Sequence, residues 1–449
     1  MMDKTTSPLY NGSSSNETDW ASSDLSIGDR RLSFGVTEKS LSFAGGFAGS
    51  MLATFPMNIL LQKYGPHKVM TVVGILCTLT VAVTPLVVCW SFPAFVVLRV
   101  ISGISISNSF PVAGTVINEW GTTAEKGLFV AVLSGYVELS ALFTMPVSGL
   151  IATRGEDVLL PDHVAASGAP LHQLIMSDYF RDKPQKHPFV AEREWQRISF
   201  GKKPSAGKTA TPLQRILRSM VIWSVWAAVI GNFLVAQFTI SYSPLYLTYV
   251  LGFPTMTAGF ITIAPLAAQL LIKMVTGLAS DRLACLSELG KLRMFNSIAL
   301  LGSGLFFILL SVIPPAGGIA DVILIIIPVA LLGFSSGGYP KCAVMVSQQH
   351  SPFVMSIVQM VACGSLLAGS FVVPALTRDD TFDQWRTVFL IYALVLTLSN
   401  TIFVTFASAE PAKWTASASD APVEPLKPDL SVSKGTCSPV KLQCSSIQA

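Results

Sequence analysis

The chain has 449 residues and a net charge of +4, and it is 51% hydrophobic but only 12% charged. Soluble domains carry roughly 25% charged residues, and the deficit here comes from apolar runs long enough to cross a bilayer. The sequence therefore predicts an all-α polytopic membrane protein. Its small net charge, with the basic residues gathered in loops, argues against nucleic acid as a partner and leaves the lipid bilayer as its surroundings.

The sequence does not contain the residue patterns of common catalytic sites. Paired carboxylates, a nucleophile elbow and a phosphate-binding loop are all missing. The seven cysteines have no spacing typical of a metal site or a disulfide framework. We therefore expect no enzyme activity, no metal and no cofactor.

Residues 1–40 are polar and are predicted to form a disordered segment outside the cytoplasm. Acidic residues outnumber basic residues there, six to four, which favours the outer side. Two glycosylation sequons begin at Asn11 and Asn16, and both would be modified only on that side. A cytosolic disordered tail is the alternative.

Hydropathy predicts ten membrane spans, which we group into an incomplete N-terminal bundle over 41–152 and a six-helix C-terminal bundle over 220–408. The spans are expected at about 41–61, 69–89, 91–117, 128–152, 220–249, 255–280, 294–314, 320–344, 353–377 and 387–408. The basic loops 281–293 and 341–350 are predicted to be cytoplasmic.

The connection between the bundles, 153–219, is predicted to be a mostly cytoplasmic loop, because ten Lys or Arg lie between Arg181 and Arg218. Residues 409–449 are predicted to form a disordered cytoplasmic tail. Counting crossings exposes a conflict: an outside N-terminus and four spans leave the chain outside at residue 152. Either 153–180 crosses the membrane, or a helix has been lost.

The span 91–117 contains an arginine on a small, polar stripe. Arg99, Gly103, Ser107 and Pro111 recur every four residues and share one helix face. Ser102 and Asn108 extend that surface. Because an arginine inside a span costs roughly 2.5–3.5 kcal/mol, it marks a functional site by default. We interpret Arg99, Ser102 and Asn108 as anion-binding candidates; the alternative is that Arg99 snorkels to the membrane surface.

Two more ionisable residues lie inside predicted spans. Glu138 is about ten residues into its span, roughly 15 Å deep at 1.5 Å per residue. It could be a protonatable coupling acid, the partner of Arg99, or a member of a structural ion pair. Lys273 could belong to such a pair or could snorkel to the cytoplasmic side. In the span 220–249, Asn232 and Tyr246 could line the substrate path or form hydrogen bonds between helices.

The two halves resemble each other, and repeated halves with a site between them are typical of secondary transporters. The loop after 255–280 reads Gly277-Leu278-Ala279-Ser280-Asp281-Arg282. It resembles the signature loop of the major facilitator superfamily. The resemblance implies two pseudo-symmetric helical bundles and makes Gly277, Asp281 and Arg282 the residues of a cytoplasmic gating loop.

Further motifs resemble the anion and phosphate cotransporter family, which includes sodium–phosphate cotransporters, the lysosomal sialic acid carrier and vesicular glutamate carriers. They are Leu98-Arg99-Val100 with Gly103 and Phe110-Pro111, Tyr246-Leu247 with Val250-Leu251-Gly252-Phe253, Phe295-Asn296-Ser297-Ile298, Trp385-Arg386-Thr387-Val388-Phe389-Leu390, and Tyr179-Phe180-Arg181-Asp182. The match covers about 41–152 and 179–415. The resemblance implies twelve helices, whereas the sequence predicts ten spans. We therefore expect that the first and the sixth helices of the family are absent from this chain.

Several positions depart from the glutamate-carrying relatives. Ile106 stands where they place a carboxylate, seven residues after the arginine, and Leu234 to Ala236 replace an arginine-containing stretch. The first paired loop has Gln62-Lys63 in place of Asp-Arg. These departures argue against glutamate as a substrate and leave the ion coupling open.

Taken together, the sequence predicts a secondary active transporter of organic or inorganic anions that works by alternating access. We expect coupling to H⁺ or Na⁺, a monomeric protein, and residence in the plasma membrane or in a vesicle or lysosome membrane. The alternative is a transport-inactive, truncated membrane protein that acts through protein interactions. A channel is disfavoured because no filter-like repeat is present.

Overall fold

The computed structural model describes residues 36–122, 125–144, 181–199, 212–315, 318–378 and 381–415. Within these ranges every regular element is a helix. Asn11, Asn16 and residues 145–180 lie outside the described residues, so the expectations for them stay predictions.

The N-terminal half consists of helices that, singly or end to end, are long enough to cross a bilayer. Its elements are α1 (Val36–Tyr64), α2 (Pro66–Trp90), α3 (Phe92–Ile106), α4 (Ser109–Trp120) and α5 (Lys126–Ser134), with helix resuming at 136–144. The connecting segment has three short elements, η2 (Pro184–Lys186), α8 (Glu192–Ser199) and α9 (Leu213–Leu217). Helix α1 is described from Val36, and its membrane-spanning part, Ser40–Tyr64, begins one residue before the predicted position.

The C-terminal half is longer and is interrupted at several points. Its elements are α10 (Met220–Gln237), the π-helix η3 (Phe238–Tyr242), α11 (Ser243–Tyr249), α12 (Thr255–Ile261), α13 (Ile263–Arg282), α14 (Glu288–Val312), α15 (Ile319–Leu331), η4 (Leu332–Gly337), α16 (Tyr339–Ser347), η5 (Gln348–His350), α17 (Ser351–Leu376), α18 (Phe382–Phe406) and η6 (Lys413–Thr415).

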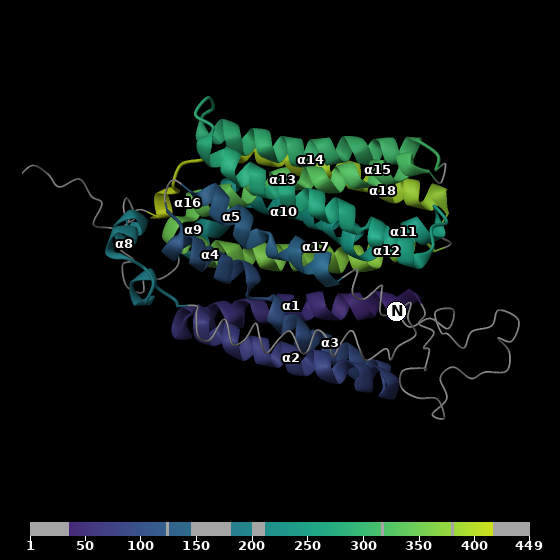
Figure 1. Ribbon diagram of the computed structural model, residues 1–449, viewed down its shortest axis with the longest axis horizontal. Coiled ribbons are helices and arrows are strands. Elements are labelled where there is room, and N and C mark those ends of the chain that lie inside the picture. The colour runs from purple at the N-terminus through teal and green to yellow at the C-terminus, as the bar shows by residue number, and fades with distance from the viewer. Residues whose placement is uncertain are drawn as a thin grey trace, which may run out of the picture. The chain divides into compact units, whose positions relative to one another are not determined.

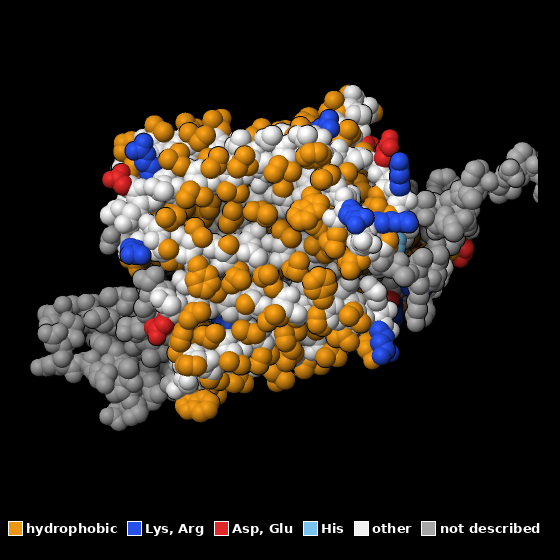
Figure 2. Space-filling view, turned by 180° about the vertical axis from the view of Figure 1, so that it is seen from behind, with side chains coloured by type: hydrophobic (Ala, Val, Ile, Leu, Met, Phe, Trp, Pro, Cys, Tyr) orange, Lys and Arg blue, Asp and Glu red, His pale blue; other side chains and the backbone are white. Residues whose placement is uncertain are grey.

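Nine helical stretches among the described residues are long and apolar enough to cross a membrane. One of them, Ile319–Leu376, has 58 residues, or about 87 Å of helix, against roughly 30 Å of hydrocarbon. It therefore holds two crossings, with the reversal at Gln348, a non-glycine residue with φ of 41°. The described residues therefore hold ten crossings, as hydropathy predicts, and the end of the fourth predicted span, 145–152, lies outside them. Figure 2 shows the matching surface, with apolar side chains along the helices and most charged ones at the helix ends.

Hydrogen bonds at the N-termini of α2 and α14 fix how these helices follow the preceding chain. Gly65, with φ of 86°, reverses the chain before α2, whose second residue, His67, donates its backbone N–H to Asp182 Oδ1 at 2.7 Å. Asp182 thus ties the connecting segment to the start of α2. At the start of α14, the Ser287 hydroxyl accepts the Gly290 N–H at 3.1 Å. Both contacts satisfy N–H groups that a helix leaves free at its first turn.

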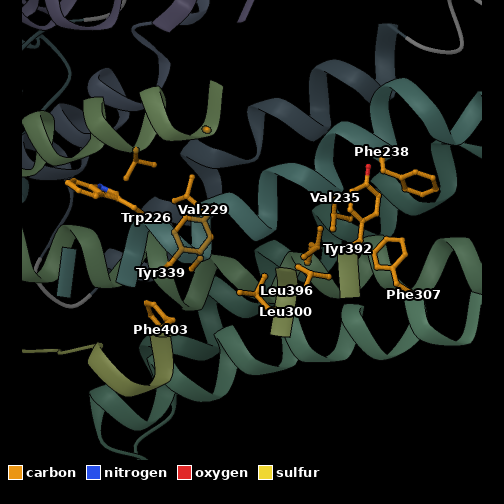
Figure 3. Packing of buried hydrophobic residues seen from close by; sticks show 14 of the residues in the cluster. Trp226, Val229, Val235, Phe238, Leu300, Phe307, Tyr339, Tyr392, Leu396 and Phe403 are labelled. Atoms are coloured by element: carbon orange, nitrogen blue, oxygen red, sulfur yellow. The ribbon is translucent and has the colours of Figure 1, made fainter. Parts of the chain in front are cut away.

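The C-terminal bundle has one large apolar core centred on aromatic rings. Phe238 packs edge-on against Phe307 of α14 and Tyr392 of α18, with ring centroids 5.9 and 6.0 Å apart; Figure 3 shows the three rings together. The buried apolar residues of the N-terminal half form a smaller cluster around Met57, Val73 and Val112, and Ile117 and Val130 cluster with Val344 of the C-terminal half.

The N-terminal half relies on close helix contacts instead. A Cβ at Gly103 of α3 would overlap the Gly46 carbonyl group of α1, and one at Gly49 would overlap that of Val100. Small residues that let backbones approach are a usual basis of helix packing in membranes. On its other side, α1 packs against α17 of the C-terminal bundle (Figure 1). The glycine in the Arg99 stripe therefore serves helix packing.

The described part of the predicted disordered tail is docked on the bundle. The Ala412 N–H donates to the Val346 carbonyl at 3.0 Å, and the Gln349 amide donates to the Thr415 carbonyl at 2.7 Å. The ordered chain thus extends through Thr415, and the prediction of disorder from 409 onward is wrong for its first seven residues. Residues 416–449 are outside the described part.

Close packing at Gly103 gives a test of the N-terminal bundle. We expect Gly103→Ala to lower the stability of the purified protein by about 1–3 kcal/mol, because the added methyl group cannot fit against α1. The measurement is the thermal unfolding midpoint in detergent. Gly259→Ala is the matched control: nothing lies within 4 Å of a Cβ there, so the midpoint should stay or rise slightly. Equal midpoints for both variants would contradict the packing argument.

Candidate functional site

Arg99 lies on the side of α3 that faces α1. Its Cβ would be 3.1 Å from a Cβ placed on Gly45, and its guanidinium Cζ is 5.5 Å from the centre of the Phe95 ring. α1 in turn packs against α17 of the opposite bundle, and the Arg99 side chain is exposed. A cation over an aromatic face is a favourable contact that leaves the charge in place.

The two polar neighbours predicted beside Arg99 are engaged within the N-terminal half. The Ser102 hydroxyl donates to the Arg99 backbone carbonyl at 2.8 Å. Asn108 is buried, and its side-chain amide donates to Met70 Sδ of α2 at 3.1 Å. Neither polar group is placed beside the guanidinium, so their roles as substrate ligands remain predictions.

Asn232 and Tyr246 have different surroundings in the C-terminal half. Tyr246 is 2% exposed, and its ring centroid lies 5.3 Å from those of both Trp385 and Phe389. We therefore attribute Tyr246 to aromatic packing rather than to a substrate path. Asn232 is buried with its Oδ1 lacking a hydrogen-bond partner among the described residues, so it keeps an acceptor available.

Glu138 and Lys273 meet across the boundary between the two halves. Lys273 Nζ lies 2.6 Å from Glu138 Oε1 and also donates to the Ser134 carbonyl at 3.4 Å. Their side chains are 5% and 9% exposed. The partner of Glu138 is thus Lys273 and not Arg99, and the alternative that Lys273 snorkels to the surface is wrong. The second carboxylate oxygen, Oε2, is buried without a partner among the described residues.

Asp281, at the end of α13, holds the start of α5. Its Oδ1 accepts the Gly127 N–H at 2.9 Å and its Oδ2 accepts the Leu128 N–H at 2.8 Å. These N–H groups are free at a helix N-terminus, whose partial positive charge favours a carboxylate. A Cβ at Gly277 would lie 2.6 Å from Ala131 Cβ, so a glycine is needed for the close approach. Arg282 is exposed at the end of α13.

Lys341 completes this contact from a position that differs from the predicted one. It was expected in a cytoplasmic loop, but it lies in α16 and is 3% exposed. Its Nζ donates to Asp281 Oδ1 at 3.1 Å and to Ser280 Oγ at 2.9 Å, and it lies 3.3 Å from Glu288 Oε2. The signal that could have located it is the apolar run 342–346 that follows, which continues the span beyond the lysine.

These contacts define what we call the α5–α13 seam: Gly127, Ala131, Ser134 and Glu138 on one side, and Lys273, Gly277 and Asp281 on the other. The seam joins the two halves at the end that the basic loops mark as cytoplasmic. Because it is held by hydrogen bonds and close backbone contacts, the structure is closed at that end.

Comparisons with known proteins agree with this architecture. The family model described as Major Facilitator Superfamily matches residues 18–352. A solved structure of the proton:xylose symporter XylE superposes with a TM-score of 0.67 at 15% identity, covering 84% of this chain and 88% of that chain. At that identity the likeness supports the fold alone.

Two curated relatives show which part of the superfamily this chain resembles. Sialin of Homo sapiens is 24% identical over 374 residues, covering 82% of this chain and 75% of sialin. Sodium-dependent phosphate transport protein 3 of Mus musculus is 20% identical over 386 residues, covering 85% and 79%. The chain is thus a multi-pass membrane transporter rather than an enzyme: it belongs to the Major Facilitator Superfamily, among the relatives of sialin and the phosphate cotransporters.

Proposed function

We propose that the protein is a secondary active transporter of small organic or inorganic anions. The observation that carries this proposal is Arg99, a cation inside a membrane span on the side of α3 that faces α1. A guanidinium presents paired donors that match the oxygens of a carboxylate, phosphate or sulfonate. Two relatives, sialin and a sodium-dependent phosphate transport protein, accord by name with this substrate class.

Alternating access gives the contacts between the halves a mechanical role. The α5–α13 seam and the α1–α17 contact join the two bundles, and rocking of one bundle against the other would have to part contacts along this boundary. In the closed arrangement described here, Asp281 holds α5 from the opposite bundle. Opening toward the cytoplasm would require that contact to break.

The driving force would be a proton or sodium gradient, with no cofactor. Glu138 is the best candidate for a protonatable group, because it is a carboxylate buried well inside a span.

We propose small anions other than glutamate as substrates, since Ile106 replaces the carboxylate that glutamate-carrying relatives have at that position. A single chain supplies both bundles, which accords with a monomer.

The substrate proposal is tested by uptake into proteoliposomes. The panel is phosphate, urate, sialic acid, glutamate and an aromatic sulfonate, each with an imposed proton or sodium gradient. We expect Arg99→Gln to reduce gradient-driven uptake by about 10- to 100-fold, since a charge-assisted hydrogen bond contributes about 1.5–3 kcal/mol. Arg99→Lys should retain part of the activity, because lysine keeps the charge and loses the paired geometry.

The matched control is Arg386→Gln, which removes an exposed arginine of α18 and should leave uptake unchanged. Uptake that survives Arg99→Gln would remove Arg99 from the anion site. A folded, membrane-inserted protein that transports no anion on the panel would favour the alternative of a transport-inactive membrane protein.

The Asp281 contact predicts a change in conformation. We expect Asp281→Asn to increase the fraction of molecules open at the cytoplasmic end by about tenfold or more, since two charge-assisted hydrogen bonds to α5 are weakened. The measurement is the distance distribution between spin labels at Val132 and Leu278, which are exposed on α5 and α13. Asp383→Asn, at the opposite end of the bundle on α18, should leave the distance distribution unchanged. A similar change in the distance distribution of Asp383→Asn would count against a specific role for the Asp281 contact.

A further inference from the structure

We propose that a cavity in the N-terminal half binds an acidic phospholipid of the cytoplasmic leaflet, with an acyl chain between α4 and α5 and the phosphate at Trp120 and Arg181. The cavity has a volume of about 660 Å³ and is bounded by α2, α4, α5 and the connecting segment from Arg181 onward. Arg99 is not among its described lining residues. Such a lipid would be a resident partner of the protein, distinct from the anion that it is proposed to carry.

The helix that begins with α5 presents opposite faces to the cavity and to the C-terminal bundle. Phe129, Leu133 and Tyr136 line the cavity and recur every three or four residues, so they share one face. Phe129 follows Gly127 of the α5–α13 seam by two positions, and Leu133 follows Ala131 in the same way, which is a rotation of about 200° around the helix. The cavity is therefore separate from the seam, and an occupant does not compete with the contact between the bundles.

The cavity has the depth of one membrane leaflet. Along α4 its lining runs from Trp120, at the cytoplasmic end, back to Ser109, a rise of about 16 Å at 1.5 Å per residue. Half of a hydrocarbon core of roughly 30 Å is about 15 Å. The lining side chains of α4 between these ends are apolar: Val112, Ala113 and Val116. Such a wall gains from contact with an acyl chain, whereas a small hydrophilic anion gains nothing from it.

The cytoplasmic end of the cavity carries hydrogen-bond donors. Trp120 Nε1 is buried and has no hydrogen-bond partner among the described residues. The His187 ring packs edge-on against the Trp120 ring, with centroids 5.5 Å apart, and both His187 and Arg181 line the cavity. An indole N–H and a guanidinium both donate to phosphate oxygens. Glu194 is the one carboxylate among the described lining residues, and it is exposed to solvent, which screens its charge.

The connecting segment brings further basic charge to this membrane surface. Residues 181–199 hold five Lys or Arg and three Asp or Glu, and one of these acids, Asp182, already binds the start of α2. Phe189, which lines the cavity, is 75% exposed, as expected of an aromatic ring at the level of the headgroups. Basic pockets between membrane helices on the cytoplasmic side bind acidic headgroups. Charge complementarity therefore favours an acidic phospholipid over a neutral one.

The test counts the lipid that the full chain retains. The protein is purified from vesicles with equal amounts of phosphatidylcholine and phosphatidylglycerol of the same acyl chains, and bound lipid is counted by native mass spectrometry. We expect phosphatidylglycerol to be retained about tenfold in preference to phosphatidylcholine. Leu133→Trp fills the cavity and should reduce retention about tenfold or more. Arg181→Gln should reduce the preference for the acidic lipid about fivefold, because a charge-assisted hydrogen bond is lost.

Matched variants separate the cavity from the rest of the surface. Val132→Trp makes a comparable substitution one residue before Leu133, at an exposed position that is not among the described lining residues. Arg218→Gln removes an exposed arginine at the far end of the connecting segment. Both variants should retain phosphatidylglycerol as the unsubstituted protein does. Arg181→Gln leaves the apolar wall unchanged, so it decides the question should Leu133→Trp not fold.

A soluble headgroup separates the lipid from a free phosphate. Glycerol 3-phosphate has the phosphate without acyl chains, and at millimolar concentration it should not displace bound phosphatidylglycerol. Displacement by glycerol 3-phosphate would assign the site to a small phosphate and overturn the lipid. Equal retention of the two lipids, or retention that Leu133→Trp leaves unchanged in folded protein, would overturn it as well. None of these readings requires uptake, so lipid binding and anion transport fail separately.

Discussion

Charges inside a membrane must be paired, and that constraint organises the contact between the two halves of this protein. An uncompensated lysine or glutamate in an apolar seam is costly, so Lys273 and Glu138 hold their two helices together. The Asp281 carboxylate obeys the same rule at the membrane surface, where it is satisfied by two backbone N–H groups and by Lys341. Both contacts are specific to the closed arrangement, because each takes its partner from the opposite half.

The two halves achieve stability in different ways, and the difference suits a rocking mechanism. The C-terminal bundle is built around interlocked aromatic rings, such as Phe238 with Phe307, which fix one arrangement through large buried areas. The N-terminal bundle depends on backbone contact at glycines, such as Gly103 against Gly46. Small residues form smooth surfaces along which helices can approach closely. The contacts that must reorganise are then the polar ones on the seam, while each bundle keeps its own packing.

Hydropathy alone was sufficient to predict the ten spans, because a membrane helix must satisfy its backbone internally and shield itself with a long apolar run. The partner of Glu138 could not be predicted in the same way. Lys273 is 135 residues away in the sequence, and only the packing of α5 on α13 selects it over Arg99. Lys341 was misplaced for a related reason: a lysine in the sequence normally marks a loop, and here buried acceptors on α13 allow it inside a span. Tyr246 has a polar group that a substrate path could use, but its ring packs against the rings of Trp385 and Phe389.

The contacts between the two halves can be judged from the described residues alone. The family resemblance implies twelve helices, and the ten spans found here leave the first and sixth unaccounted for. The contacts between the halves are nevertheless made by helices that are present: α1 with α17, α4 with α17, and α5 with α13. The seam that must open and its two polar contacts therefore do not depend on the helices that are unaccounted for.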